Sequence, residues 1–162
     1  MRLNVGHLYN KPIGTSHEVP VAFDTLKIDD LLIKDLSTVV LLSRTREGIL
    51  LQASGSAKVE TACVRCLDEF FLPVDFEFQE LYEFPSRYRE ETDLILPEDG
   101  YLDLSELFRE YLILAIPIKR LCSLDCKGLC VVCGANLNET SCEHHPVKPE
   151  QSIIIEDEET AS

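Results

Sequence analysis

The chain has 162 residues, of which 45% are hydrophobic and 27% charged, and it carries a formal net charge of −14 at pH 7. This composition suits a protein with one core, and no apolar run reaches the ~18 residues that a membrane-spanning helix needs. Residues 1–7 lack the apolar stretch of a secretory signal, so we expect a cytoplasmic protein whose cysteines are reduced rather than joined in a disulfide framework.

The negative charge is concentrated in one part of the chain. Residues 68–110 contain fourteen acidic and three basic residues, and residues 148–162 add a net charge of −4. Because a field of this sign repels phosphate backbones, the charge excludes broad electrostatic binding of nucleic acid. We interpret the acidic residues between 68 and 110 either as a solvated surface or as a face that meets a basic protein partner.

The first half of the chain has the patterns of β-strands. Gly55 is expected to separate two of these strands, and the alternation over 74–79 predicts a strand with an acidic outer face. Cys63 and Cys66 lie between two of the predicted strands, so we expect them at or near the tip of a hairpin. The predicted strands cover residues 37–43, 49–53, 57–63 and 74–79.

An amphipathic helix is expected after an exposed, acidic connection over residues 85–100. Asp103 and Glu106 have the spacing of a capping box at its start, and Pro117 ends it. Its apolar residues form one stripe that we expect to pack against the sheet. The stripe consists of Leu104, Leu107, Phe108, Tyr111, Leu112 and Ala115.

These segments predict an α+β fold, in which an antiparallel β-sheet carries one main amphipathic helix and a small C-terminal zinc-knuckle appendage. We expect a core domain over 1–121 and a cysteine-rich zinc-binding segment over 122–147, which is too poor in large apolar residues to fold without a metal. Residues 148–162 form an acidic tail, in which 153–155 either add an edge strand or belong to a disordered terminus.

The seven cysteines carry the strongest functional signal. Together with one histidine they form four close pairs, and a tetrahedral zinc ion takes four thiolate or imidazole ligands, usually as two such pairs. One or two structural zinc ions are therefore expected. The pairs are Cys63 with Cys66, Cys122 with Cys126, Cys130 with Cys133, and Cys142 with His144.

The pairs are expected to form two sites. We call Cys130, Cys133, Cys142 and His144 the knuckle group, because Cys130-x2-Cys133-Gly134 is a zinc-knuckle pattern. We call Cys63, Cys66, Cys122 and Cys126 the hairpin group, in which a metal would join the hairpin tip to the segment after the helix. Three alternatives stay open: a site that combines Cys63 and Cys66 with Cys130 and Cys133, a single site with spare thiols, and His145 in place of His144.

The sequence favours a protein without enzymatic activity. A redox C-x2-C pair would precede a helix, whereas Cys63 and Cys66 are flanked by predicted strands. Catalytic zinc needs an open coordination position, which four protein ligands do not leave. Four basic residues near the cysteines either balance the thiolates or contact nucleic acid, namely Arg65, Lys119, Arg120 and Lys127.

Several of these motifs, in their order along the chain, resemble the bacterial YceD family from about residue 10 to residue 145. The motifs are Cys63-Val64-Arg65-Cys66-Leu67, then Leu114-Ala115-Ile116-Pro117 shortly before Cys122, and the run C-K-G-L-C-x2-C-G-x-N-L-N that starts at Cys126. The final pair departs from the family, in which it is commonly C-x-C, because histidine stands at position 144. Histidine is also a zinc ligand.

The resemblance implies a non-enzymatic ribosome-biogenesis factor, because members of the family are implicated in 23S rRNA accumulation and large ribosomal subunit assembly. Its partners would then be large-subunit rRNA or ribosomal proteins, with no membrane and no small-molecule substrate. The alternative is a zinc-ribbon adaptor that binds protein partners in transcription or another RNA process. A thiol redox protein is the third and weakest interpretation.

Overall fold

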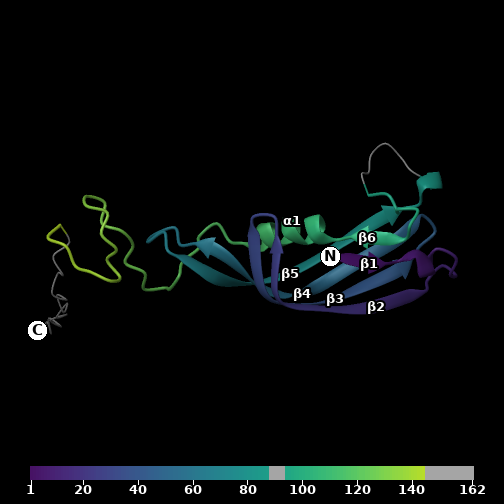
Figure 1. Ribbon diagram of the computed structural model, residues 1–162, viewed down its shortest axis with the longest axis horizontal. Coiled ribbons are helices and arrows are strands. Elements are labelled where there is room, and N and C mark those ends of the chain that lie inside the picture. Colours follow the sequence, from purple (N-terminus) through teal and green to yellow (C-terminus); the bar gives the residue numbers. More distant parts are fainter. Residues whose placement is uncertain (88–93, 145–162) are drawn as a thin grey trace, which may run out of the picture.

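The computed structural model describes residues 1–87 and 94–144, and it contains one long antiparallel sheet covered on one face by a helix (Figure 1). Strand order in the sheet is β2-β3-β4-β5. A second, two-stranded sheet pairs β1 (Arg2–Asn4) with β6 (Tyr101–Asp103). The long strands are β2 (Ser16–Ile28), β3 (Leu31–Arg44), β4 (Gly48–Ala62) and β5 (Glu69–Glu83), and the helix is α1 (Ser105–Ala115). Two 3-10 turns, η1 (Gly6–Leu8) and η2 (Pro85–Arg87), flank these elements.

The predicted α+β class is confirmed, because the sheet is antiparallel throughout, α1 is the one α-helix of the described residues, and a cysteine cluster follows it. Side chains alternate along each strand, so one face of the sheet is buried under α1. The rings of Phe76 and Phe78 on β5 meet Phe108 of α1 edge-on, with centroids 5.6 and 5.2 Å apart. On the other face of β5, Asp75 and Glu77 are exposed, as the sequence predicts.

The predicted helix stripe packs against the sheet. Its residues Leu104, Leu107, Phe108 and Leu112 are buried, and Tyr111 and Ala115 pack at the edge of the same core. The helix ends before Pro117, since Ile116 is already extended with φ −72° and ψ 121°.

The predicted capping box is wrong. The N-cap of α1 is Leu104, one residue later than expected, because Asp103 still belongs to β6 and pairs with Arg2. The Asp103 carboxylate nevertheless accepts a hydrogen bond of 3.0 Å from the backbone N–H of Ser105, so it satisfies one of the free donors at the helix start.

The strand break predicted at Gly55 is also wrong, because β4 runs through it. Gly55 pairs with Thr38 of β3, next to a register shift between Lys34 and Ser37, and the β3 backbone lies close against it. A Cβ atom at position 55 would lie 2.2 Å from the Ser37 carbonyl oxygen. The glycine therefore allows a close approach of two strands rather than ending one.

Strand β2 is missing from the sequence-based expectation. Its apolar alternation is interrupted by Pro20, which argues against a central strand. The structure places β2 at an edge of the sheet, where a proline is tolerated. The β1–β6 pair was not expected either, since its two strands have three residues each and lie far apart in the sequence.

Figure 1 shows the cysteine-rich segment, in green to yellow, at one end of an elongated molecule and beyond the tip of the β4–β5 hairpin. The helix of the described part of the chain is too short to span a membrane. Most of the predicted connection over 85–100 is described, but 88–93, the tail over 148–162 with its edge strand at 153–155, and His145 lie outside the described residues.

Replacing Gly55 with alanine is predicted to lower the free energy of unfolding by about 1–3 kcal/mol, because the new methyl group overlaps the β3 backbone. Urea-induced unfolding of the full chain measures the change. Ser54→Ala is the matched control, since Ser54 is its exposed neighbour on β4, and it should change stability by less than about 0.5 kcal/mol. Equal stability of the two variants would contradict the close approach.

Candidate metal centres

The hairpin group is assembled from two distant segments. Cys63 and Cys66 lie in the turn that joins β4 to β5, just beyond the last pair of the ladder, Ala62 with Glu69. The turn is closed by hydrogen bonds from Cys63 N–H to the Asp68 carbonyl (2.9 Å) and from Leu67 N–H to the Cys63 carbonyl (3.0 Å). The predicted position of this cysteine pair at a hairpin tip is confirmed.

The chain after α1 crosses this hairpin tip and delivers Cys122 and Cys126. The backbone N–H of Val64 donates to the Arg120 carbonyl at 2.9 Å, which fixes the crossing. The Arg65 guanidinium donates to the Cys126 carbonyl, also at 2.9 Å. As a result, the four sulfur atoms of the hairpin group lie within 4.8 Å of one another.

The sulfur positions fit a zinc ion. The Sγ atoms of Cys63 and Cys126 are 3.7 Å apart, and those of Cys66 and Cys122 are 3.6 Å apart. A disulfide bond would bring two sulfurs to about 2.05 Å. Tetrahedral zinc with Zn–S bonds of about 2.3 Å separates its sulfurs by about 3.8 Å. The spacing therefore matches a four-thiolate zinc site, of which only Cys122 is exposed.

Hydrogen-bond donors point at two of the sulfurs. The backbone N–H of Arg65 lies 3.5 Å from Cys63 Sγ, and the side-chain amide of Asn138 lies 3.3 Å from Cys126 Sγ. The pKa of Cys63 is lowered to about 6, chiefly by the backbone N–H of Cys66, and the pKa of Cys126 is lowered chiefly by the Asn138 amide. Both residues are therefore biased toward the thiolate, the form that binds metal.

Cys66 shows the opposite direction. The backbone N–H of Asp68 lowers the pKa of Cys66. Burial, the Asp68 carboxyl and the neighbouring Cys122 and Cys63 thiols together raise this pKa by more, so the net shift is upward. Four adjacent thiols cannot all ionise without a cation, because each new negative charge disfavours the next. A divalent ion at the centre of the group removes this conflict.

The knuckle group forms within one short segment. The N–H of Cys130 donates to the Ala135 carbonyl and that of Gly134 to the Cys130 carbonyl, both at 2.8 Å, and Gly134 has a positive φ of 75° that favours glycine. The pKa of Cys130 is lowered to about 6, first by the backbone N–H of Cys133 and then by that of Val132. The four ligand atoms of this group also lie within 4.8 Å of one another.

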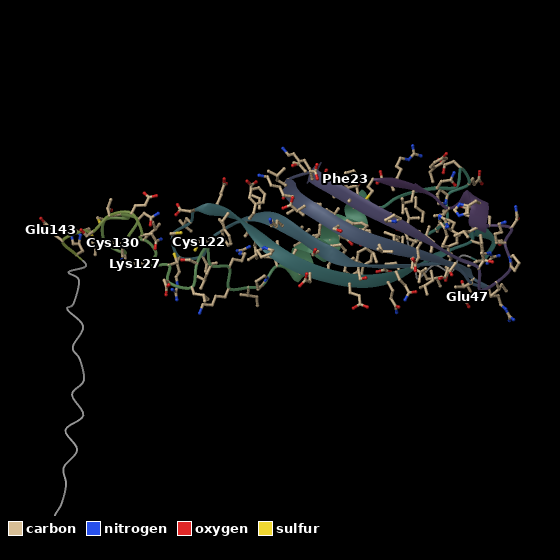
Figure 2. The ribbon with its side chains drawn as sticks, turned by 90° about the horizontal axis from the view of Figure 1, so that it is seen from below. Phe23, Glu47, Cys122, Lys127, Cys130 and Glu143 are labelled. Carbon is tan, nitrogen blue, oxygen red and sulfur yellow. The ribbon has the colours of Figure 1, made fainter. Side chains whose placement is uncertain are left out.

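The structure thus brings all eight candidate ligands into two separate groups, each with the donor set of a tetrahedral site. Figure 2 shows Cys122 of the hairpin group and Cys130 of the knuckle group on either side of Lys127. Within the described residues, Cys63 and Cys66 share no group with Cys130 and Cys133. Which atoms hold a metal stays a prediction, and the alternative ligand His145 lies outside the described residues.

Three polar residues at this end of the molecule were not expected to take part in the site. Asp68 accepts from Cys63 through its carbonyl, and its carboxylate accepts from the Asn136 amide at 2.9 Å. The side-chain amide of Asn138 donates to Cys126 Sγ, a contact that the sequence alone does not predict. The position of Asn136 and Asn138 within the cysteine run indicated that they lie near the site. Their contacts follow no local pattern, because Asn136 bonds to Asp68, 68 residues away, and Asn138 bonds to Cys126, 12 residues away.

Comparison with known proteins gives one family match. The family model described as "Large ribosomal RNA subunit accumulation protein YceD" matches residues 51–153 of the chain. An uncharacterized protein of Mycobacterium tuberculosis is 26% identical over 141 residues, which cover 84% of this chain and 67% of that protein. No solved structure matches the chain.

Two plant proteins match a shorter part. Both are described as "Large ribosomal RNA subunit accumulation protein YCED homolog 1, chloroplastic". The one from Zea mays is 46% identical over 43 residues, and the one from Arabidopsis thaliana is 43% identical over 47 residues. The matches cover 26% and 29% of this chain, respectively, and 15% of each plant protein.

The two groups predict a specific zinc stoichiometry, measured by elemental analysis of the purified, reduced full chain. The unmodified chain is expected to hold two zinc ions, and Cys63→Ser and Cys133→Ser are each expected to lose one. The double variant should hold none, because the two cysteines serve different ions. If Cys63 and Cys133 shared one site, the double variant would keep one zinc ion, which would contradict the two groups.

Proposed function

The chain belongs to the YceD family of large ribosomal RNA subunit accumulation proteins, and from this membership we propose that it is a ribosome-biogenesis factor. In this role it supports the accumulation of 23S rRNA and the assembly of the large ribosomal subunit. The observation that carries the proposal is the family match over residues 51–153, which spans β4 from Leu51 onward, all of β5 and both cysteine groups. The names of the two plant relatives point to the same process.

We propose that the protein acts without catalysis and that its metal is structural zinc. Each cysteine group offers four ligand atoms, so a tetrahedral zinc ion bound there keeps no position for water or substrate. Zinc would instead hold two chain segments together at the end of the sheet. The role of the ions is then to shape the surface that ribosomal partners meet.

Domain limits at 1–121, 122–147 and 148–162 remain our proposal. The hairpin group supports a metal-linked boundary, because it takes Cys63 and Cys66 from the core and Cys122 and Cys126 from the following segment. A zinc ion there would fasten the cysteine-rich segment to the core domain. The knuckle group would then fold the rest of that segment.

Basic ribosomal proteins are the partners that we propose for the acidic residues between 68 and 110. Asp75 and Glu77 are exposed on β5, and Glu106 and Glu110 are exposed on α1. Since β5 is an edge strand, its charges also protect the sheet from pairing with other strands. A basic partner is compatible with this protection. It neutralises the negative charge only when it binds, so the edge strand stays charged when the partner is absent.

We propose that rRNA contacts the cysteine end of the molecule, where several basic side chains lie. Exposed Arg65 and Lys127 lie beside the hairpin group, and Lys119 and Arg120 belong to the segment that crosses the hairpin tip. Large apolar side chains are exposed in the same segment, with Ile118 98% and Leu124 90% exposed. This end of the molecule therefore offers individual cationic side chains next to exposed apolar ones, which suits a protein–RNA particle better than bare duplex.

Depletion of the protein in its bacterial host tests the proposed function. We predict less 23S rRNA relative to 16S rRNA and a smaller 50S peak in sucrose gradients, because large-subunit assembly would lack a factor. Expression of the unmodified chain should restore both. A normal gradient profile and a normal 23S rRNA level after complete depletion would count against the ribosome role and leave the zinc-ribbon adaptor as the better interpretation.

Charge reversal on β5 tests the protein partners. The variant Asp75→Lys with Glu77→Lys should lose most of its association with ribosomal proteins in pull-downs from pre-50S fractions, because the basic partner then meets like charge. Asp24→Lys with Glu47→Lys is the matched control, since these exposed acids lie on other parts of the molecule and give the same change of net charge. Equal binding by the two variants would refute an acidic docking face on β5.

A further inference from the structure

The segment between the two ligand pairs of the knuckle group contacts the hairpin group. The side chain of Asn138 is held at both ends: its Oδ1 accepts from the backbone N–H of Lys127 at 2.8 Å, and its Nδ2 donates to Cys126 Sγ at 3.3 Å. Asn138 thus belongs to one candidate site by sequence and to the other by contact.

Further hydrogen bonds fix this segment against the hairpin. Asn136 Nδ2 donates to the Asp68 carboxylate at 2.9 Å, and Asn136 Oδ1 accepts from the N–H of Asn138 at 3.1 Å. Along the backbone, Leu137 N–H donates to the Gly128 carbonyl at 2.9 Å and Leu129 N–H to the Arg65 carbonyl at 3.0 Å. The hydrogen-bonded fold of this segment therefore fixes the position of the Asn138 amide.

Gly128 makes this arrangement possible. It has a positive φ of 77°, and a Cβ atom there would lie 3.1 Å from the Arg65 carbonyl oxygen and 3.3 Å from the Arg65 Cβ. The chain between Cys126 and Cys130 consequently lies directly against the hairpin turn that carries Cys63 and Cys66. The two candidate sites are therefore connected by the short segment from Cys126 to Cys130, which is hydrogen-bonded to the hairpin turn and is not a free linker.

We infer that Asn138 couples the two metal sites, so that zinc binding by the knuckle group strengthens zinc binding by the hairpin group. A metal in the knuckle group fixes residues 134–141 between its ligand pairs, and with them the amide that donates to Cys126 Sγ. A donor to a metal-bound thiolate stabilises the negative charge that the sulfur keeps. By linkage, zinc in the hairpin group strengthens the knuckle site by the same factor.

This inference rests on the proposed zinc binding and assigns Asn138 a positioning role, since it acts on the metal through Cys126. Partners of metal ligands typically contribute 10–100-fold to metal affinity, and we expect a factor of about that size here. The donor is also neutral, so it supports the thiolate without competing with it for the ion. Aspartate at position 138 would keep the acceptor for Lys127 but turn a carboxylate toward the sulfur.

A competition titration of the full chain with a chromophoric zinc chelator tests the coupling. Asn138→Ala should weaken the hairpin site by about 10–100-fold, and Asn138→Asp by at least as much, because it replaces the donor with a negative charge. Asn10→Ala is the control, since Asn10 is an exposed asparagine in the turn after η1 and lies outside both groups. Cobalt(II) absorption assigns each loss, because a site with four sulfurs and one with three sulfurs and a nitrogen have different spectra.

A second background separates coupling from a local effect. In a chain with Cys130→Ser and Cys133→Ser, the knuckle site is absent and the hairpin site should already be weakened by the same factor. Adding Asn138→Ala there should change nothing further, so the two changes are non-additive. An equal loss from Asn138→Ala in both backgrounds would overturn the coupling, as would a hairpin affinity within twofold of the unmodified chain in every variant.

The titration also distinguishes failure of this inference from failure of the zinc proposal. If the unmodified chain binds two zinc ions and Asn138→Ala leaves the hairpin site unchanged, only the coupling is refuted. If the unmodified chain binds no zinc, both are refuted. Thermal unfolding of the sheet, followed by circular dichroism, should be the same for Asn138→Ala and Asn10→Ala, because neither side chain belongs to the hydrophobic core.

Discussion

The convergence of four sulfurs from segments 56 or more residues apart is the constraint on which the cysteine end of the molecule depends. The hydrophobic core beneath α1 is formed by strands and helix, and it does not extend to this end. There, the buried cluster consists of Cys63, Cys66 and Cys126 with Phe70 and Leu121 packed against it. So small a cluster cannot hold the segment after α1 by apolar burial, and a metal ion bound by thiolates would take over that role.

The convergence of the four sulfurs also determines where basic and apolar residues are exposed at this end of the protein. The hairpin group sets the path of the chain over the tip of β4 and β5, and that path carries the basic and apolar residues proposed to meet rRNA. The carboxylates of β5 and α1 lie on the body of the molecule instead. Two zinc ions do not neutralise seven thiolates, so the loaded protein remains acidic, and the four basic side chains near the cysteines lie beside this residual negative charge. That pattern suits a factor that contacts proteins and RNA together.

Features with a local signature could be predicted from the sequence, and those set by distant segments could not. The stripe of α1 follows from the helical period, the hairpin tip from strands on either side of Cys63 and Cys66, and the candidate ligands from their spacing. Strand β2 was missed because Pro20 is tolerated only at an edge, and edges are defined by the assembled sheet. Gly55 was misinterpreted because its role depends on how closely β3 approaches it in the assembled sheet. The Asn138 contact was missed because Asn138 reaches Cys126 only in the folded cysteine-rich segment.

Hydrogen exchange with and without zinc tests most directly whether metal shapes the cysteine end. With zinc bound, the amides of Val64 and Leu129 should exchange slowly, because their hydrogen bonds join the hairpin turn to the chain after α1. The amide of Leu137 should also exchange slowly, because its hydrogen bond to the Gly128 carbonyl holds the cysteine-rich segment folded. After chelation they should exchange rapidly, while amides in the middle of β3 and β4 keep their protection. Identical protection of the cysteine end in both states would contradict the account, and so would loss of protection throughout the sheet.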